Sequence, residues 1–232
     1  MSNKKDFAEA VDHINADYPN IAVLSRLSTL LKEHDTDLEN VARLIRSEPS
    51  LTSNVIKISN SSFYGSPVAC TNIQDALSRI GFSEVLKVVA LILAKELTKN
   101  DLEKYGMSAD DYWRECLTVS LLAEELSRPC KINSADAATV GLLHNIGRVV
   151  INNILEEFRI DLYWDVSISV VDWEKTVVGF HYGEAGGRFL KKMKFPAETQ
   201  EIIQYHVEPE TSPTTEPLID LLHFCAQLSK SL

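Results

Sequence analysis

A polar pair, His144 and Asn145, interrupts an apolar stretch in the second half of the chain. The surrounding run, residues 134–157, repeats apolar residues at steps of three and four, which predicts a helix that faces a core. The apolar ridge consists of Val140, Leu143, Ile146, Val150 and Ile154. A buried polar side chain without a partner costs about 1–3 kcal/mol, so this pair needs either hydrogen-bond partners or a chemical purpose. Gly147 follows the pair and marks a place where the helix can break.

Size and composition favour an all-α protein. The chain has 232 residues, which suffices for one large domain or two small ones with a real core. It is 45% hydrophobic and 24% charged, as is ordinary for a soluble globular protein. Only nine glycines and long periodic stretches indicate that helices make up the fold.

The net charge of −10 argues against direct binding to nucleic acid, because such a surface repels phosphate backbones. One dense basic patch is present, and we interpret it as a solvated helix face. It consists of Arg188, Lys191, Lys192 and Lys194.

The cysteines and the apolar runs predict a cytoplasmic protein that does not insert into membranes. Four scattered cysteines contain no C-x-x-C pair, so we expect reduced thiols rather than a disulfide frame or a zinc site. No signal-peptide core follows the first residues. The longest apolar run, residues 88–94, is far shorter than the ~20 residues that span a bilayer.

Periodicity and capping signals predict helices along the whole chain. The expected spans are residues 4–16 (ended by Pro19), 21–32, 36–48, 50–60, 73–80, 84–99, 112–126, 134–157, 170–178, 181–192, 196–206 and 218–228. Residues 36–39 and 71–74 have the pattern of capping boxes, and Ser83 and Ser134 are further expected caps. Residues 158–168 contain several β-formers, but a loop or helix is favoured over a strand there.

Four segments resemble known families. Residues 142–148 (LLHNIGR) resemble the Leu-Leu-His-Asp-Ile-Gly-Lys/Arg motif of the HD superfamily of metal-dependent phosphohydrolases, with asparagine in place of aspartate. Three earlier segments, in the same order, are similar to the HDOD (HD-related output domain) family: residues 44–52 (LIRSEPSLT), 60–65 (NSSFYG) and 76–81 (ALSRIG). The resemblance covers about residues 20–230.

The HDOD resemblance implies an all-helical, two-lobed domain. We expect a short helical extension over residues 1–19, an N-terminal helical lobe over residues 20–107, and an HD-like lobe over residues 108–232 that packs on it.

The same resemblance implies positions for the metal ligands, and most of them are altered here. Their occupants in this chain are Glu115, His144, Asn145, Tyr182 (beside a displaced His181), His206 and Gln227. An amide supplies one weak carbonyl ligand and no charge where a carboxylate would balance a cation. We therefore expect no bound metal and no cofactor, although two histidines and one carboxylate could in principle form a metal set.

Two functional hypotheses from different classes follow from the resemblance. The leading one is a non-catalytic regulatory module of bacterial signal transduction that binds a signalling protein or a small ligand. The alternative is a divergent metal-dependent phosphodiesterase or nucleotide phosphohydrolase that uses Glu115, His144 and His206. A scaffold without a ligand is a weaker third hypothesis. The sequence specifies neither the partner nor the oligomeric state.

Two further features of the sequence, four aromatic residues and a glycine-rich segment, could have a functional role. Exposed aromatic side chains could anchor a partner, and otherwise they would belong to the core. These aromatic residues are Phe63, Tyr64, Trp164 and Trp173. The glycine-rich residues 183–187 predict the start of a closely packed helix rather than a phosphate cradle.

Overall fold

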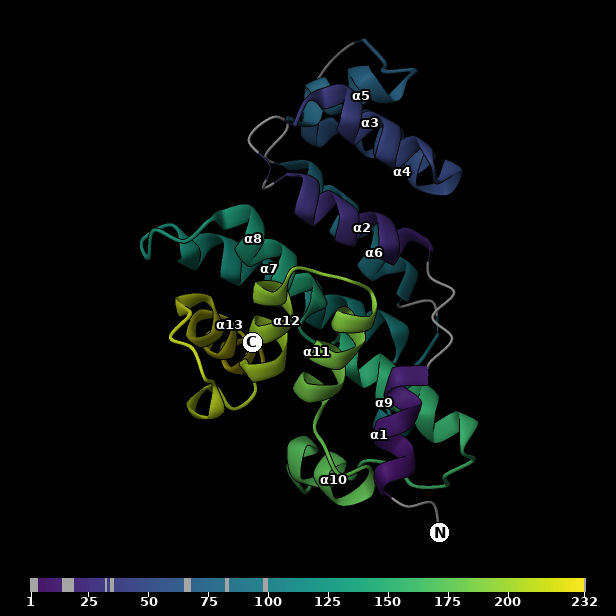
Figure 1. Ribbon diagram of the computed structural model, residues 1–232, viewed down its shortest axis with the longest axis vertical. Helices are drawn as coiled ribbons and strands as arrows, with labels where there is room; N and C mark the ends of the chain where they lie inside the picture. The colour runs from purple at the N-terminus through teal and green to yellow at the C-terminus, as the bar shows by residue number, and fades with distance from the viewer. Residues whose placement is uncertain are drawn as a thin grey trace.

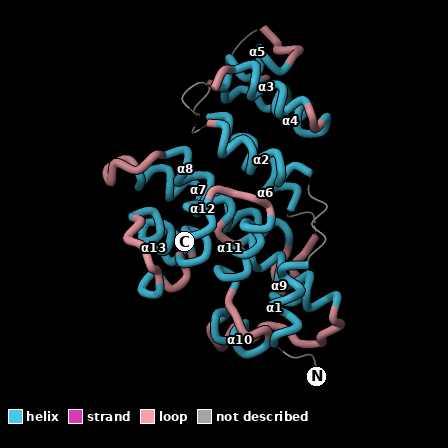
Figure 2. The backbone as a smooth tube through the Cα atoms, in the orientation of Figure 1, coloured by secondary structure: helices cyan, strands magenta, loops and turns pink. Residues whose placement is uncertain are grey.

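The protein is all-helical, as predicted. The computed structural model describes residues 4–13, 19–31, 33, 36–64, 68–81, 84–97 and 100–231, and helices with short connections make up this part of the chain (Figure 1). Figure 2 shows no strand among the described residues, where the single β-bridge pairs Leu102 with Met107. No helix in the described ranges combines the length and apolar character that a bilayer crossing requires.

The helices follow the predicted order closely. They are α1 (Lys4–His13), α2 (Pro19–Leu30), α3 (Leu38–Arg46), α4 (Pro49–Ser59), α5 (Ile73–Ile80), α6 (Val85–Leu97), α7 (Ala109–Ser127), α8 (Ser134–Leu143), α9 (Ile146–Glu157), α10 (Val170–Val177), α11 (Tyr182–Lys192), α12 (Ala197–Tyr205) and α13 (Pro217–Ser229). Short 3-10 turns lie at Ser62–Tyr64, Glu103–Tyr105 and Pro209–Thr211. Residues 158–168 form a loop, so the predicted preference against a strand is correct.

Helices α3, α4 and α5 form one end of the molecule, α2 and α6 lie beside them, and the remaining helices form a larger body (Figure 1). The first helix contacts α9 and α11, so the N-terminal segment packs on the second half of the chain. Its apolar face, with Phe7 and Val11, is buried there. The division into two lobes, with boundaries at residues 19 and 107, stays a prediction.

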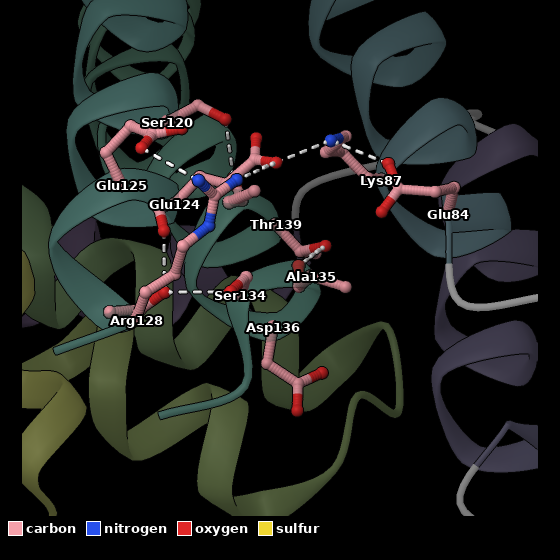
Figure 3. Close-up of polar contacts among 12 residues, drawn as sticks. Glu84, Lys87, Ser120, Glu124, Glu125, Arg128, Ser134, Ala135, Asp136 and Thr139 are labelled. Atoms are coloured by element: carbon pink, nitrogen blue, oxygen red, sulfur yellow. Dashed lines mark hydrogen bonds and ion pairs between the residues drawn. The ribbon is translucent and has the colours of Figure 1, made fainter. Parts of the chain in front are cut away.

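An ion pair of Lys87 connects the first half of the chain with the second. Lys87 of α6 places its Nζ 2.7 Å from a carboxylate oxygen of Glu84 and 2.9 Å from one of Glu124 on α7. Figure 3 shows Lys87 between these two carboxylates, with the end of α7 and the start of α8 beside them. The ion pair therefore links α6 to α7, and α6 also packs against α8.

Three helix caps differ from the predicted ones by one residue. In each case an aspartate or asparagine caps the helix instead of the adjacent hydroxyl residue, because its side-chain oxygen reaches the free N–H groups of the first turn. The observed caps are Asp37, Asn72 and Asn133, where Thr36, Thr71 and Ser134 were expected. The other expected cap, Ser83, lies outside the described residues.

One helix boundary corrects the sequence-based expectation. Pro19 begins α2 rather than ending the first helix, since proline is well suited to the first turn of a helix. The helical run over residues 134–157 breaks at His144 and Asn145, close to Gly147 as the sequence predicted. Helix α5 likewise ends at Gly81 as predicted, and this glycine has a φ of 89°.

Candidate functional site

The break between α8 and α9 positions the polar pair. His144 is the C-cap of α8, and its ring Nδ1 lies 2.7 Å from the carbonyl oxygen of Gly141. Because a carbonyl can only accept, Nδ1 carries a proton and donates it to this oxygen. Both His144 and Asn145 are fully buried.

A second histidine is held in the same way. His206 is the C-cap of α12, and its Nδ1 lies 2.8 Å from the carbonyl oxygen of Ile203. Its ring centroid is 5.9 Å from that of His144 and 5.6 Å from that of Tyr182. Burial, and then the nearby His144, lower the pKa of His206 well below its ordinary value. His206 is therefore neutral at pH 7.

An ion pair lies beside these histidines. A guanidinium nitrogen of Arg148 on α9 is 3.3 Å from a carboxylate oxygen of Glu115 on α7, and the guanidinium carbon lies 4.7 Å from the ring centre of Tyr182. Burial alone would raise the pKa of Glu115, but His144 and Arg148 lower it more, so its pKa is well below the usual range. The His144 Nε2 atom is 3.9 Å from Glu115, too long for a hydrogen bond. Glu115 is thus an ionised carboxylate whose charge Arg148 balances.

Several buried polar atoms of this cluster have no hydrogen-bond partner among the described residues. They are Nε2 of His144, Nε2 of His206, Nε of Arg148 and both amide atoms of Asn145. Buried polar atoms are nearly always paired, with protein or with ordered water, so such a concentration is typical of a functional site rather than a structural core.

Five of the six predicted site positions lie in one cluster, and the sixth, the exposed Gln227, lines the cleft beside it. Glu115, Tyr182 and Gln227 line this cleft, which has a volume of about 960 Å³ and lies between α7, α10 and α13. His144, Asn145 and His206 are buried. The displaced His181 caps α11 and faces Glu184 and Glu208 at 3.7 Å, and its ring centroid lies 6.4 Å from that of Tyr182.

Two charged residues of the site were not predicted from the sequence. Arg148 is 4% exposed although arginine is rarely buried, and its place at the end of the LLHNIGR segment was the available signal. Glu174 is fully buried; it accepts hydrogen bonds from the Tyr105 hydroxyl (2.8 Å) and from the Tyr182 backbone N–H (2.7 Å). No sequence signal distinguished Glu174 from an exposed helical carboxylate.

Glycines let the helices of the site approach closely. An added Cβ at Gly147 would lie 1.8 Å from the backbone oxygen of Tyr182. Added Cβ atoms at residues 183, 186 and 187 would each meet α12 within 2.9 Å. The glycine-rich segment is therefore closely packed, as predicted from the sequence.

The predicted aromatic anchors have three different environments. Trp173 belongs to the core, with its ring 5.4 Å from that of Tyr105. Phe63 is 82% exposed and packs edge-on against the half-buried Tyr64. Trp164 is half-buried and lines the cleft.

The residues of the cluster do not fit a two-metal phosphohydrolase centre. In the described parts of the chain, no three His, Cys, Asp or Glu side chains are arranged to hold a metal ion together. The carboxylate beside the two histidines belongs to Glu115, and Arg148 already neutralises it. Asn145, next to His144, is a neutral amide and brings no negative charge to offset a cation.

Burial makes Glu174 a pH-dependent element of stability. Desolvation raises its pKa to about 7, although Arg148 and the Tyr105 hydroxyl act in the opposite direction. The unfolded chain has a glutamate pKa of about 4.3, so between these two values the folded state binds the extra proton. The unfolding free energy should therefore fall as the pH rises from about 4.3 to 7, by about 2–3 kcal/mol from this residue.

Glu174→Gln, which mimics the protonated acid, tests this expectation. Urea unfolding at pH 5 and pH 8 should show that the variant gains about 2–3 kcal/mol relative to the unsubstituted protein at the higher pH. Equal changes in both proteins would mean that Glu174 has the same pKa in the folded and unfolded states.

The described residues form an all-helical domain with a cluster of buried polar side chains around His144. A family model described as the HDOD domain matches residues 19–209. The chain therefore belongs to the HDOD family.

One relative is similar in sequence over most of this chain. An uncharacterised protein of Treponema pallidum (strain Nichols) is 24% identical over 227 residues, which are 94% of this chain and 43% of that protein. The chain thus spans less than half the length of this relative.

Two solved structures share the fold. An HDOD domain protein of unknown function from Geobacter sulfurreducens has a TM-score of 0.70 and 20% identity over 89% of this chain and 70% of its own. A candidate phosphohydrolase from Shewanella amazonensis SB2B has a TM-score of 0.74 and 20% identity over 97% of this chain and 80% of its own. At such identities the likeness is one of fold.

Proposed function

We propose that this HDOD chain is a non-catalytic regulatory module of bacterial signal transduction, which acts in the cytoplasm by binding a protein or a small ligand. The observation that carries the proposal is the ion pair between Arg148 and Glu115. The guanidinium is a permanent cation, and it satisfies the carboxylate on which a metal site here would depend.

Electrostatics explains why this arrangement disfavours hydrolysis. A metal-dependent phosphohydrolase uses cations to polarise phosphate oxygens and to lower the pKa of a bound water. Here a divalent ion next to Glu115 would be repelled by Arg148, and the two nearby histidines would supply no negative charge. The cleft beside Glu115 therefore lacks the excess negative charge that would hold a catalytic metal.

A divergent metal-dependent phosphodiesterase or nucleotide phosphohydrolase is the alternative. One observation favours it: Glu115, His144 and His206 lie in one cluster, and the Nε2 atoms of both histidines are unpaired among the described residues. A single metal bound by two histidines and one carboxylate would require Arg148 to leave Glu115.

The two functions predict opposite results in one experiment. The purified protein is incubated with Mn²⁺, Fe²⁺ or Zn²⁺, freed of unbound metal, and examined by elemental analysis and by turnover of bis(p-nitrophenyl) phosphate and a cyclic dinucleotide. We expect far less than one metal ion per chain and no turnover above that of a His144→Ala variant. A stoichiometric metal with turnover that this variant abolishes would establish the enzyme instead.

A further inference from the structure

We infer that the cleft beside Glu115 binds a small organic anion with a flat apolar body, whose negative group lies next to Lys230 and Arg148. This inference rests on the proposed function as a binding module and names the ligand class of the same site. Ligand sites of this kind are clefts of roughly 300–1,000 Å³ with a largely apolar lining and a few polar groups. The volume here, about 960 Å³, suits a ligand of that class.

The charges lining the cleft leave one cation uncompensated. Arg114 pairs with Asp111 at 3.4 Å, and Arg148 pairs with Glu115 at 3.3 Å. Lys230 forms no ion pair with any described residue, and its Nζ has a weak contact of 3.4 Å with the amide oxygen of Gln227. These five charged residues thus give the lining a net charge of +1 in a chain of net charge −10.

A second observation points to the same chemistry. Arg148 lines the cleft although it is 96% buried, and its Nε–H has no acceptor among the described residues. Lys230, an exposed residue, lines the same cleft. Two cations on one lining repel each other, and an anion bound between them would relieve the repulsion and supply an acceptor for the Arg148 Nε–H.

Part of the cleft lining is apolar and held in place by hydrogen bonds. Trp164 lies in the loop before α10; its backbone N–H donates to the Lys104 carbonyl (2.8 Å) and its ring Nε1 donates to the Ile168 carbonyl (3.0 Å). Further apolar lining comes from Met107, Ile168, Val170, Val171 and Val207. A fixed indole beside aliphatic side chains suits a flat ring, because it provides contact area with little loss of side-chain entropy.

A matched pair of fluorescent probes tests the assignment. The anionic probe 8-anilinonaphthalene-1-sulfonate and its uncharged counterpart N-phenyl-1-naphthylamine differ by the sulfonate group. We titrate both into the full chain and into the variants Lys230→Gln, Lys230→Arg and Lys191→Gln. Lys191 is an exposed lysine of α11, so its variant removes one positive charge away from the cleft.

Only the anionic probe should depend on the cleft lysine. Lys230→Gln should weaken its binding about fivefold to tenfold, while Lys230→Arg and Lys191→Gln should change it less than about twofold. Binding of the uncharged probe should be unaffected by Lys230→Gln. Equal losses in Lys230→Gln and Lys191→Gln, or no binding of the anionic probe, would overturn the inference.

Competition then distinguishes the two kinds of anionic group. Displacement of the bound probe by AMP assigns a phosphate ligand, and displacement by indole-3-acetate assigns a carboxylate ligand. Displacement by neither compound would overturn the assignment of the cleft to an organic anion. If the probes and competitors show no anion binding in the cleft, regulation through a protein partner remains the proposed function. Metal-dependent turnover, in contrast, would refute the proposed function whatever the role of Lys230.

Discussion

Gly147→Ala is expected to destabilise the protein by about 3 kcal/mol or more, the upper end for overpacked sites. The added methyl group would lie 1.8 Å from the backbone oxygen of Tyr182, 2.7 Å from its carbonyl carbon and 2.8 Å from the backbone nitrogen of Gly186. These are backbone atoms of α11, so no side-chain rotation can relieve the contact. Helices α9 and α11 would have to separate, and with them the groups of the site.

Urea unfolding followed by circular dichroism measures this effect. Asn153→Ala on the same helix is the control, because Asn153 is half-buried and alanine is the better helix former. We expect the control to stay within about 0.5 kcal/mol of the unsubstituted protein. A Gly147→Ala variant as stable as this control would show that α9 and α11 do not approach so closely in solution.

Arg148→Met is expected to cost about 3–5 kcal/mol of stability, since it leaves the carboxylate of Glu115 largely buried without its cation. Methionine keeps much of the side-chain volume, so the loss reports mainly on charge. The guanidinium also lies over the ring of Tyr182, and losing this contact adds a smaller amount.

A second substitution separates charge from packing. Adding Glu115→Gln to Arg148→Met removes the uncompensated carboxylate, so the double variant should recover about 2 kcal/mol or more of the loss. The exposed pair Arg128 and Glu125, 3.0 Å apart, serves as the matched control. A double-mutant cycle of Arg128→Met and Glu125→Gln should give a coupling energy below about 1 kcal/mol. Similar coupling at both pairs would mean that water, rather than Arg148, neutralises Glu115.

Arg148 contributes both to the stability of the fold and to the proposed anion site. Its guanidinium balances the carboxylate of Glu115 and also lines the cleft beside it. Removing Arg148 would therefore test the stability of the fold and the proposed anion site together. Lys230→Gln tests the anion site alone, because Lys230 forms no ion pair among the described residues.

Local physics made much of the fold predictable. Apolar residues at helical spacing on Val140, Leu143 and Ile146 identify a buried face whatever the rest of the chain does. Gly81 ends its helix because a φ of 89° suits glycine. The cap residues were predicted less well, since a hydroxyl and an adjacent carboxylate or amide compete for the same free N–H groups.

The resemblance to the HD phosphohydrolases indicated candidate site positions, five of which lie in one cluster, but not their electrostatic state. That state depends on distances between α7, α9 and α11, which are far apart in sequence. Only packing decides that Arg148 lies 3.3 Å from Glu115, or that Glu174 is buried enough to raise its pKa to about 7. Helical periodicity reports which face of a helix is apolar. Charge balance and desolvation depend on which residues of another helix pack against that face, so only the tertiary structure determines the electrostatic state of the site.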